Sequence, residues 1–167
     1  MMKVNIAEAR NGNGREIPFR FSVEAEDIGA VLEHAELKDI VVQGSVVATG
    51  AAYRVSGRIT CRKDFICDRC LTPSVAEQVC EFSEEYCETA DGAEDDSINC
   101  FDGDVIDITD MIRDTLLAAQ PLSNICKSDC KGLCPVCGAN RNERECGCDS
   151  FVPDPRLAAL QQFKNLK

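Results

Sequence analysis

The stretch Cys126–Cys148, CKSDCKGLCPVCGANRNERECGC, decides how the C-terminal part of this chain folds. It places six cysteines within 23 residues, at positions 126, 130, 134, 137, 146 and 148. The segment Cys134-Pro135-Val136-Cys137-Gly138 has the spacing of a metal knuckle, in which a tight turn brings two thiolates onto one ion. A glycine after the second cysteine permits that turn. The stretch therefore predicts a metal-binding module.

A further cysteine pair lies upstream, in Cys67-Asp68-Arg69-Cys70. Together with the six it makes eight thiols, enough for two tetrahedral four-cysteine zinc sites. Keeping neighbouring cysteines together joins Cys67 and Cys70 with Cys126 and Cys130, and Cys134 and Cys137 with Cys146 and Cys148. We therefore expect two structural Zn²⁺ ions.

A different partition stays open, because Cys146-Gly147-Cys148 has a one-residue spacer and knuckles usually have two to four. In that alternative, one site is formed by Cys126, Cys130, Cys134 and Cys137. An iron–sulfur cluster is a weaker alternative to zinc, because the spacing matches neither ferredoxin pattern.

The other explanation for many cysteines is a disulfide framework in a secreted protein. The N-terminal residues 1–19 contain no apolar segment of the length that a secretory signal needs. The chain also has no run of about 18 apolar residues, the length of a membrane span. We therefore expect a cytoplasmic protein, in which thiols stay reduced and clustered cysteines bind metal.

The formal net charge of the 167 residues is −11, and it is unevenly distributed. Residues 81–114 contain thirteen acidic side chains and a single base, Arg113. This excess argues against a protein that coats nucleic acid through charge alone, and it suits a basic protein partner. Within it, residues 88–97 are so polar that we expect a solvated loop.

Alternating apolar and polar residues predict an antiparallel β-meander over Phe19–Ala25, Ile40–Thr49, Tyr53–Arg62 and Ser74–Tyr86. The Cys67/Cys70 knuckle then lies at the bend between the last two strands. In Tyr53–Arg62 the inner face is predicted to hold Val55, Gly57, Ile59 and Cys61. The other face carries Arg54, Arg58 and Arg62, which we expect to pair with Glu77, Glu81 or Glu85 rather than with RNA phosphate.

The remaining segments carry weaker signals. Residues 1–18 are predicted to form a polar lead-in with a turn at Asn11–Gly14, and Asp27–His34 to form a short turn or helix. We expect a short edge strand at Ser97–Phe101. A helix is predicted over about 107–120, and residues Asp104–Ile108 lead into it. Its N-cap is predicted to be Asp107 or Thr109. Residues Arg156–Leu166 predict a terminal amphipathic helix.

The predicted fold class is therefore α+β: an antiparallel β-meander with a packed helix, a C-terminal zinc-binding cysteine module and a terminal helix. Residues 1–120 form the first predicted domain. Residues 121–167 form the second, packed on the first through the Cys67/Cys70 knuckle.

No catalytic constellation is present in the sequence. There is no phosphate-binding loop or nucleophile motif, and His34 is the only histidine. A zinc ion held by four thiolates has no open position for water, so we expect a structural ion and no enzyme activity. Four cysteines stand singly, at Cys61, Cys80, Cys87 and Cys100, and we expect them to be buried as small hydrophobic residues.

The order of features resembles the YceD family of large ribosomal RNA subunit accumulation proteins, in its cysteine-rich branch. The resemblance runs from about Phe19 to the end, and it is carried most specifically by Cys67-Asp68-Arg69-Cys70-Leu71 and by the stretch from Lys131 to Gly138. It implies a bacterial cytoplasmic protein that supports 23S rRNA accumulation or processing and large-subunit assembly. It implies no enzymatic step and supplies no catalytic residues.

Two alternative functions are compatible with these features of the sequence. In the first, the chain is an assembly factor that holds a ribosomal protein or immature large-subunit rRNA. It binds no membrane and no small-molecule substrate. The basic residues expected to make the contact are Arg58, Arg62, Lys127, Lys131, Arg141 and Arg144. In the second, the chain is a thiol-based redox or metal-handling protein that uses the Cys67/Cys70 or Cys134/Cys137 dithiol.

Overall fold

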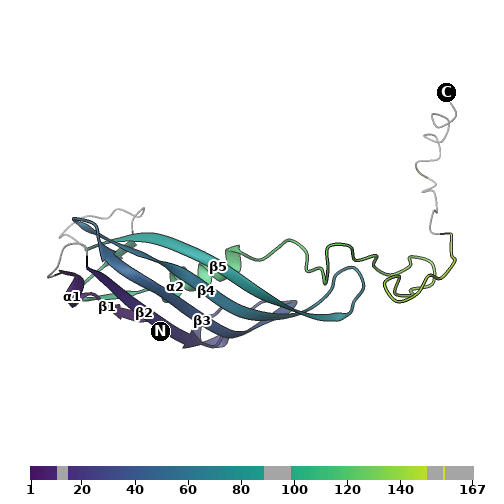
Figure 1. The fold of residues 1–167 in the computed structure, drawn as a ribbon, viewed down its shortest axis with the longest axis horizontal. Helices are drawn as coiled ribbons and strands as arrows, with labels where there is room; N and C mark the ends of the chain where they lie inside the picture. The colour runs from purple at the N-terminus through teal and green to yellow at the C-terminus, as the bar shows by residue number, and fades with distance from the viewer. Residues whose placement is uncertain (11–14, 89–98, 150–155, 157–167) are drawn as a thin grey trace, which may run out of the picture.

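A long, twisted antiparallel sheet dominates the computed structural model, which describes residues 1–10, 15–88, 99–149 and 156 (Figure 1). Its order is β2-β3-β4-β5-β6, and each strand up to β5 pairs with its sequence neighbour in an antiparallel meander. The strands are β2 (Glu16–Val23), β3 (Ala35–Ala48), β4 (Ala52–Ile66), β5 (Pro73–Glu88) and β6 (Asn99–Phe101). The chain is thus mostly β-sheet with few helices.

The β4–β5 hairpin is the longest feature of the sheet and carries the first cysteine pair at its tip. Its register is continuous from Ala52 opposite Cys87 to Ile66 opposite Pro73. Both strands extend beyond the predicted ranges, because the alternation of the inner face continues through Lys63 and Phe65, which are both buried. The extension places Cys67–Cys70 directly at the turn.

A pair of glycines lets two aromatic rings close over the middle of the sheet. Gly44 of β3 lies opposite Gly57 of β4. A Cβ atom on Gly44 would lie 2.8 Å from the ring of Phe19, and one on Gly57 would lie 2.8 Å from the ring of Phe82. The two rings stack with their centroids 6.4 Å apart. Gly57 therefore belongs to the inner face, as predicted, because only a residue without a side chain fits beneath the ring.

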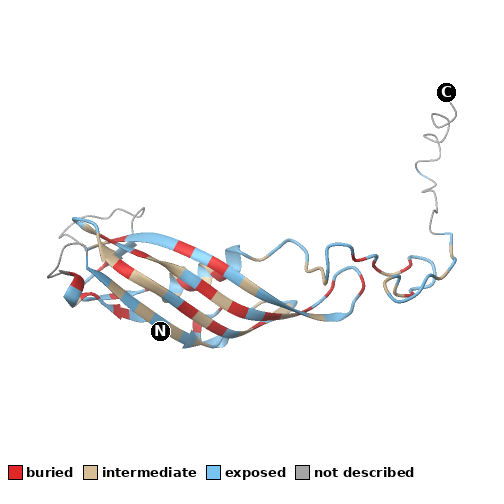
Figure 2. Cartoon of the chain, viewed as in Figure 1, coloured by how far each residue is buried: buried red, intermediate tan, exposed pale blue. Residues whose placement is uncertain are grey.

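The core lies between the inner face of the sheet and a layer made of β1 (Lys3–Asn5), β7 (Val105–Asp107), η1 (Glu26–Ile28) and α2 (Thr109–Ala118). The short helix α1 (Ala7–Arg10) follows β1. Buried and exposed residues alternate along the long strands, as the red and blue bands of Figure 2 show. The prediction for the inner face is confirmed, since Val55, Ile59 and Cys61 are buried.

The N-terminus differs from the predicted polar lead-in. Met2 and Ile6 are fully buried, and β1 forms an antiparallel ladder with β7, about a hundred residues away in sequence. Residues around Asp104–Ile108 are therefore strand rather than the beginning of a helix. Each of the two partners is only three residues long, too short for a recognisable alternation, so only their long-range pairing specifies them.

Helix α2 is shorter than the predicted range of about 107–120. Ile108 occupies the N-cap position, but Asp107 Oδ1 accepts the N–H of Thr109 at 3.0 Å and its hydroxyl at 2.6 Å. Asp107, one residue before the N-cap position, thus accepts a backbone N–H that has no partner within the helix. Ile112 and Leu116 of α2 are buried against the core.

The single cysteines separate into two groups. Cys61 and Cys80 are buried in the core, as expected. Cys100 is exposed and Cys87 is half-buried, so the prediction of burial is wrong for these two. Both lie where the short edge strand β6 meets β5, and three residue pairs of parallel ladder cover little surface.

Several predictions fall outside the described residues: the Asn11–Gly14 turn, nearly all of the acidic loop over about 88–97, and the terminal helix at 156–166. The division into two domains stays a prediction. Among the described residues, no helix is both long and apolar enough to cross a membrane.

Candidate metal centres

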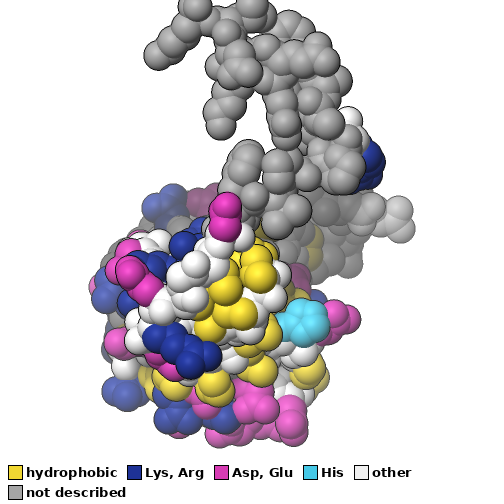
Figure 3. Space-filling model, turned by 90° about the vertical axis from the view of Figure 1, so that its right-hand side faces the viewer, with side chains coloured by type: hydrophobic (Ala, Val, Ile, Leu, Met, Phe, Trp, Pro, Cys, Tyr) yellow, Lys and Arg dark blue, Asp and Glu magenta, His cyan; other side chains and the backbone are white. Residues whose placement is uncertain are grey.

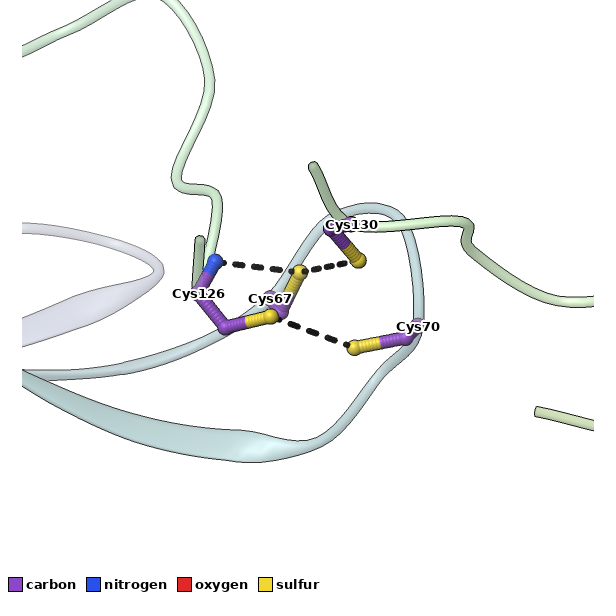
Figure 4. Close-up of side chains that lie close together, drawn as sticks. All are labelled: Cys67, Cys70, Cys126 and Cys130. Atoms are coloured by element: carbon purple, nitrogen blue, oxygen red, sulfur yellow. Dashed lines mark hydrogen bonds between the residues drawn. The ribbon is translucent and has the colours of Figure 1, made fainter. Parts of the chain in front are cut away.

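The structure brings four thiols together at the tip of the β4–β5 hairpin: Cys67, Cys70, Cys126 and Cys130 (Figure 4). All four sulfurs lie within 4.8 Å of one another. The Sγ atoms of Cys67 and Cys130 are 3.9 Å apart, and those of Cys70 and Cys126 are 3.7 Å apart. A tetrahedral zinc with Zn–S bonds of about 2.3 Å requires sulfurs about 3.8 Å apart. The donor set therefore fits one zinc ion.

Backbone hydrogen bonds close this first knuckle of the hairpin. The N–H of Leu71 donates to the carbonyl oxygen of Cys67 at 2.8 Å, and the N–H of Cys67 donates to that of Thr72 at 3.0 Å. Leu71 adopts a left-handed conformation with φ of 56°. The turn thus holds both thiols on one side, although it contains no glycine.

The two residues between the cysteines attach the distant part of the chain. The N–H of Asn124 donates to Asp68 Oδ2 at 2.6 Å, and the N–H of Asp68 donates to the carbonyl oxygen of Asn124 at 2.8 Å. Arg69 Nη1 donates to the carbonyl oxygen of Cys130 at 3.2 Å. Asp68 and Arg69 therefore position the segment that carries Cys126 and Cys130.

Lys63 makes a third attachment, which the sequence reasoning missed. Its side chain is buried in the inner face of β4, and its Nζ donates to Gln120 Oε1 at 2.6 Å and to Asn124 Oδ1 at 2.7 Å. Burial lowers the pKa of Lys63, while the Cys61 thiol and the Asp68 carboxylate oppose that effect. A lysine at an inner position of an alternating strand is the sequence signal that could have revealed this contact.

Hydrogen bonds from backbone N–H groups favour the thiolate form of Cys67, whereas burial and the neighbouring thiols raise the pKa of Cys126. Burial raises the pKa of Cys67, but the N–H groups of Cys126, Cys70 and Arg69 outweigh it and lower that pKa to about 6. The N–H of Cys126 lies 3.4 Å from Cys67 Sγ. Backbone donors around a sulfur are the environment that a metal-bound thiolate needs.

The second cluster contains the other four predicted ligands, Cys134, Cys137, Cys146 and Cys148, again within 4.8 Å of one another. The N–H of Gly138, whose φ is 70°, donates to the carbonyl oxygen of Cys134 at 2.9 Å. The N–H groups of Cys137 and Val136 lower the pKa of Cys134 to about 6. Gly147, with φ of 65°, allows the tight turn between the last two cysteines.

The eight thiols are therefore grouped as the favoured partition has them, and the alternative set of Cys126, Cys130, Cys134 and Cys137 is divided between the two clusters. The clusters differ in exposure. Three thiols of the first are buried, whereas in the second Cys134 alone is buried and Cys137 is exposed.

Polar contacts join the two clusters to each other. Asn142 Nδ2 donates to Cys130 Sγ at 3.4 Å, and Asn142 Oδ1 accepts the N–H of Lys131 at 2.9 Å. The N–H of Leu133 donates to the carbonyl oxygen of Arg69 at 3.0 Å. Gly132 passes so close to Arg69 that an added Cβ would lie 3.0 Å from that same oxygen. The second cluster is thus built directly against the first knuckle.

The basic residues proposed to contact a partner lie in two settings. On the outer face of the sheet, Arg58 pairs with Glu81 at 3.2 Å, and Arg62 pairs with Asp39 at 3.3 Å and Asp64 at 3.2 Å. Arg54 similarly pairs with Glu85 at 2.9 Å. Carboxylates thus pair with all three arginines, although Arg62 uses partners other than the expected glutamates.

The other setting is the cysteine-rich segment. Lys127 Nζ lies 3.9 Å from Asp129 Oδ1. Lys131, Arg141 and Glu145 line a pocket at the second cluster, together with Cys134, Cys146, Gly147 and Cys148. Within the described residues, Lys131, Arg141 and Arg144 are exposed and form no ion pair with a carboxylate. Of the six basic residues expected to contact a partner, these three thus have no carboxylate partner in the described part of the chain.

Comparisons with known proteins connect this chain to one protein family. The sequence model described as "Large ribosomal RNA subunit accumulation protein YceD" matches residues 55–164, which include both cysteine clusters. The chain is 49% identical over 59 residues to the "Large ribosomal RNA subunit accumulation protein YCED homolog 1, chloroplastic" of Arabidopsis thaliana. That alignment covers 35% of this chain and only 18% of the plant protein.

Longer alignments connect the chain to mycobacterial proteins described as uncharacterized. It is 29% identical over 152 residues to one from Mycobacterium tuberculosis and, to the same extent, to one from Mycobacterium bovis. Each alignment covers 87% of this chain and 69% of the relative. No solved structure matches the chain.

Proposed function

Since the chain belongs to the YceD family, we propose that it is a non-catalytic factor that supports accumulation of 23S rRNA and assembly of the large ribosomal subunit. In this proposal its two cysteine clusters each hold one structural Zn²⁺. The observation that carries it is the arrangement of eight thiols in two tetrads within the region that the family model matches.

The two tetrads support a structural role for the metal. Four thiolates fill the coordination sphere of zinc, so a bound ion offers no open position for a water nucleophile or a substrate. The segment after α2 contains no helix or strand within residues 119–149, only turns and one isolated bridge between Leu133 and Asn140. Zinc binding supplies folding free energy to such a segment.

A partner then binds through the rigid loops of the cysteine-rich segment. Lys131, Arg141 and Arg144 are its exposed cations without a carboxylate partner among the described residues. Two tetrathiolate zinc sites would make this segment more negative, so these cations also offset local charge. We propose that Lys131 and Arg141, beside the second tetrad, contact immature rRNA phosphate or an acidic patch on a ribosomal protein.

The competing function is thiol redox chemistry at a CxxC dithiol. It requires a pair that carries no metal and is open to exchange. In the structure each CxxC pair shares its cluster with two further thiols, and Cys67 and Cys70 are buried. The geometry therefore favours metal binding over dithiol exchange.

The test is complementation in a host cell that lacks the protein, read out as the ratio of mature 23S to 16S rRNA. We expect the wild type to restore the ratio and Cys130→Ser and Cys134→Ser to fail, with reduced zinc in the purified variants. The matched control, Cys100→Ser, removes an exposed cysteine outside both tetrads and should restore the ratio fully. Full restoration by zinc-depleted variants would contradict the role of the metal.

A further inference from the structure

Strand β5 has an open outer edge along most of its length. It pairs with β4 over its whole length, but on its other side it pairs with β6 only through Tyr86, Cys87 and Glu88. Within the described part of the chain, no strand or loop makes a backbone hydrogen bond to the outer side of residues 73–85. Figure 1 shows β5 as the upper border of the sheet.

Proteins normally protect a long edge strand with prolines, charged side chains (lysines above all), bulges or a covering element. The opposite edge, β2, is protected in this way, since it is eight residues long and carries Pro18 and Arg20 in exposed positions. The charged residues of strand β5 are all glutamates, its one proline is the first residue, and its register with β4 has no bulge. The open edge is therefore a feature of β5 in particular.

The side chains along this edge indicate what it can bind. On the outer face of β5, Val75 and Val79 alternate with Glu77 and Glu81, and Val75 and Val79 are 66% and 53% exposed. Glu81 is paired with Arg58, but Arg62, opposite Glu77, turns to Asp39 and Asp64. Within the described residues, the Glu77 carboxylate therefore forms no ion pair.

A groove crosses the hairpin end of the sheet, from the start of β3 over β4 to the start of β5. Its apolar lining includes Phe65, Ile66, Pro73 and Val75, and its acidic lining consists of Glu33, Glu36, Asp64 and Asp68. Figure 3, which views this end of the molecule, shows hydrophobic side chains gathered next to the histidine, with acidic and basic groups around them. The groove and the edge thus share exposed β-branched residues, Ile66, Val75 and Val79, with carboxylates nearby.

We propose that the outer edge of β5 binds an extended, Lys/Arg-rich segment of a partner protein, which adds to the sheet as a further strand. Backbone hydrogen bonds would give the affinity, while cross-strand Lys–Glu and aliphatic pairs would give the selectivity. The inference rests on the sheet alone and is independent of the zinc sites and of the proposed role in rRNA accumulation.

The same charges argue against other occupants. A second copy of the chain would place one acidic β5 along another, with no basic side chain on either strand. RNA would bring its phosphates against Glu77, Glu81 and Glu84, all exposed. A basic polypeptide is the occupant that matches both the open backbone and the carboxylates.

The test uses the full chain and a synthetic peptide of about ten residues in which Lys alternates with Val and Thr. Amide hydrogen exchange is measured for the free and the peptide-bound protein. We expect alternate amides between Ser74 and Glu85 to exchange rapidly in the free chain and to slow about tenfold or more with peptide. A peptide of the same sequence, N-methylated at alternate residues, should bind about tenfold or more weakly.

Two variant pairs separate this contact from general charge attraction. Glu77→Lys should weaken peptide binding about threefold or more, and Glu16→Lys, the same change on the β2 edge, should leave it unchanged. If Glu77→Lys alters the fold, a second pair of variants at exposed valines repeats the comparison. Val79→Lys on β5 should weaken peptide binding, and Val31→Lys should leave it unchanged.

Four results would overturn the proposal. The first is slow exchange of all β5 amides in the free chain. The second is equal binding of the N-methylated peptide. The third is the same protection from a uridine oligonucleotide, which would identify RNA as the occupant. The fourth is protection that appears with protein concentration alone, which would identify a second copy.

Discussion

Leu71 and Gly138 occupy the same position in the two cysteine knuckles. Each follows the second cysteine, each has positive φ (56° and 70°), and each donates its N–H to the carbonyl oxygen of the first cysteine, at 2.8 and 2.9 Å. The second knuckle uses the residue that adopts this conformation without strain, whereas the first uses leucine. The two turns therefore have the same geometry and unequal backbone strain.

This difference predicts opposite effects of two substitutions. Leu71→Gly should raise the free energy of unfolding by about 0.5–1 kcal/mol, because it relieves the left-handed strain of an exposed leucine. Gly138→Ala should lower it by about 1 kcal/mol, because nothing but the backbone conformation opposes the new methyl group. Urea unfolding of the zinc-loaded protein measures both. A loss of stability in Leu71→Gly would show that its side chain contributes more than its strain.

The unequal burial of the clusters predicts that zinc leaves in two phases. A chelator should remove the ion of the second cluster first, because Cys137 is exposed and Cys146 and Cys148 are half-buried, while Cys67 is fully buried. Absorbance of a zinc–chelator complex follows the release. Cys137→Ser should remove the fast phase and keep the slow one. Release in a single phase from the wild type would contradict the assignment.

Asp68 should matter for docking the cysteine segment onto the hairpin. Asp68→Ala leaves the N–H of Asn124 without its acceptor at 2.6 Å and should cost about 1–2 kcal/mol of stability. Asp68→Asn keeps an acceptor oxygen and is the matched control. Thermal or urea unfolding of the zinc-loaded variants provides the comparison. Equal stability of the two variants would mean that this hydrogen bond contributes nothing.

Cys61 predicts a specific dependence on pH. Burial, together with the nearby Cys80, raises the pKa of Cys61 from 9.0 to about 11. Between these values the unfolded chain loses this proton while the folded chain keeps it, so stability falls as the pH rises through this window. Cys61→Ala should therefore lose less stability than the wild type between pH 9 and 11 in urea unfolding. Parallel loss in both proteins would contradict the prediction.

Local patterns were enough to predict the meander and to group the cysteines. The alternation in Tyr53–Arg62 correctly assigned Val55, Ile59 and Cys61 to the core, because a strand buried on one face imposes a period of two. The rule of keeping neighbouring cysteines together gave the grouping that the structure shows. Both signals act over a few residues.

Long-range pairings could not be predicted in this way. The ladder between β1 and β7 joins two three-residue strands about a hundred residues apart in the sequence, and neither has a pattern of its own. The contacts of Lys63 with Gln120 and Asn124 depend on where the chain returns after α2. Cys100 is exposed and Cys87 is half-buried because β6 is short. The length of that strand cannot be read from the two cysteines themselves.

The central claim, that the eight grouped cysteines hold two structural zinc ions, is tested most directly by metal analysis. The measurement is the metal content per chain of wild-type protein purified without added zinc, alongside Cys130→Ser and Cys134→Ser. We expect about two zinc ions per wild-type chain, with depletion of a different tetrad in each variant. One zinc ion, iron, or metal-free protein with disulfides among these cysteines would rule out two zinc sites.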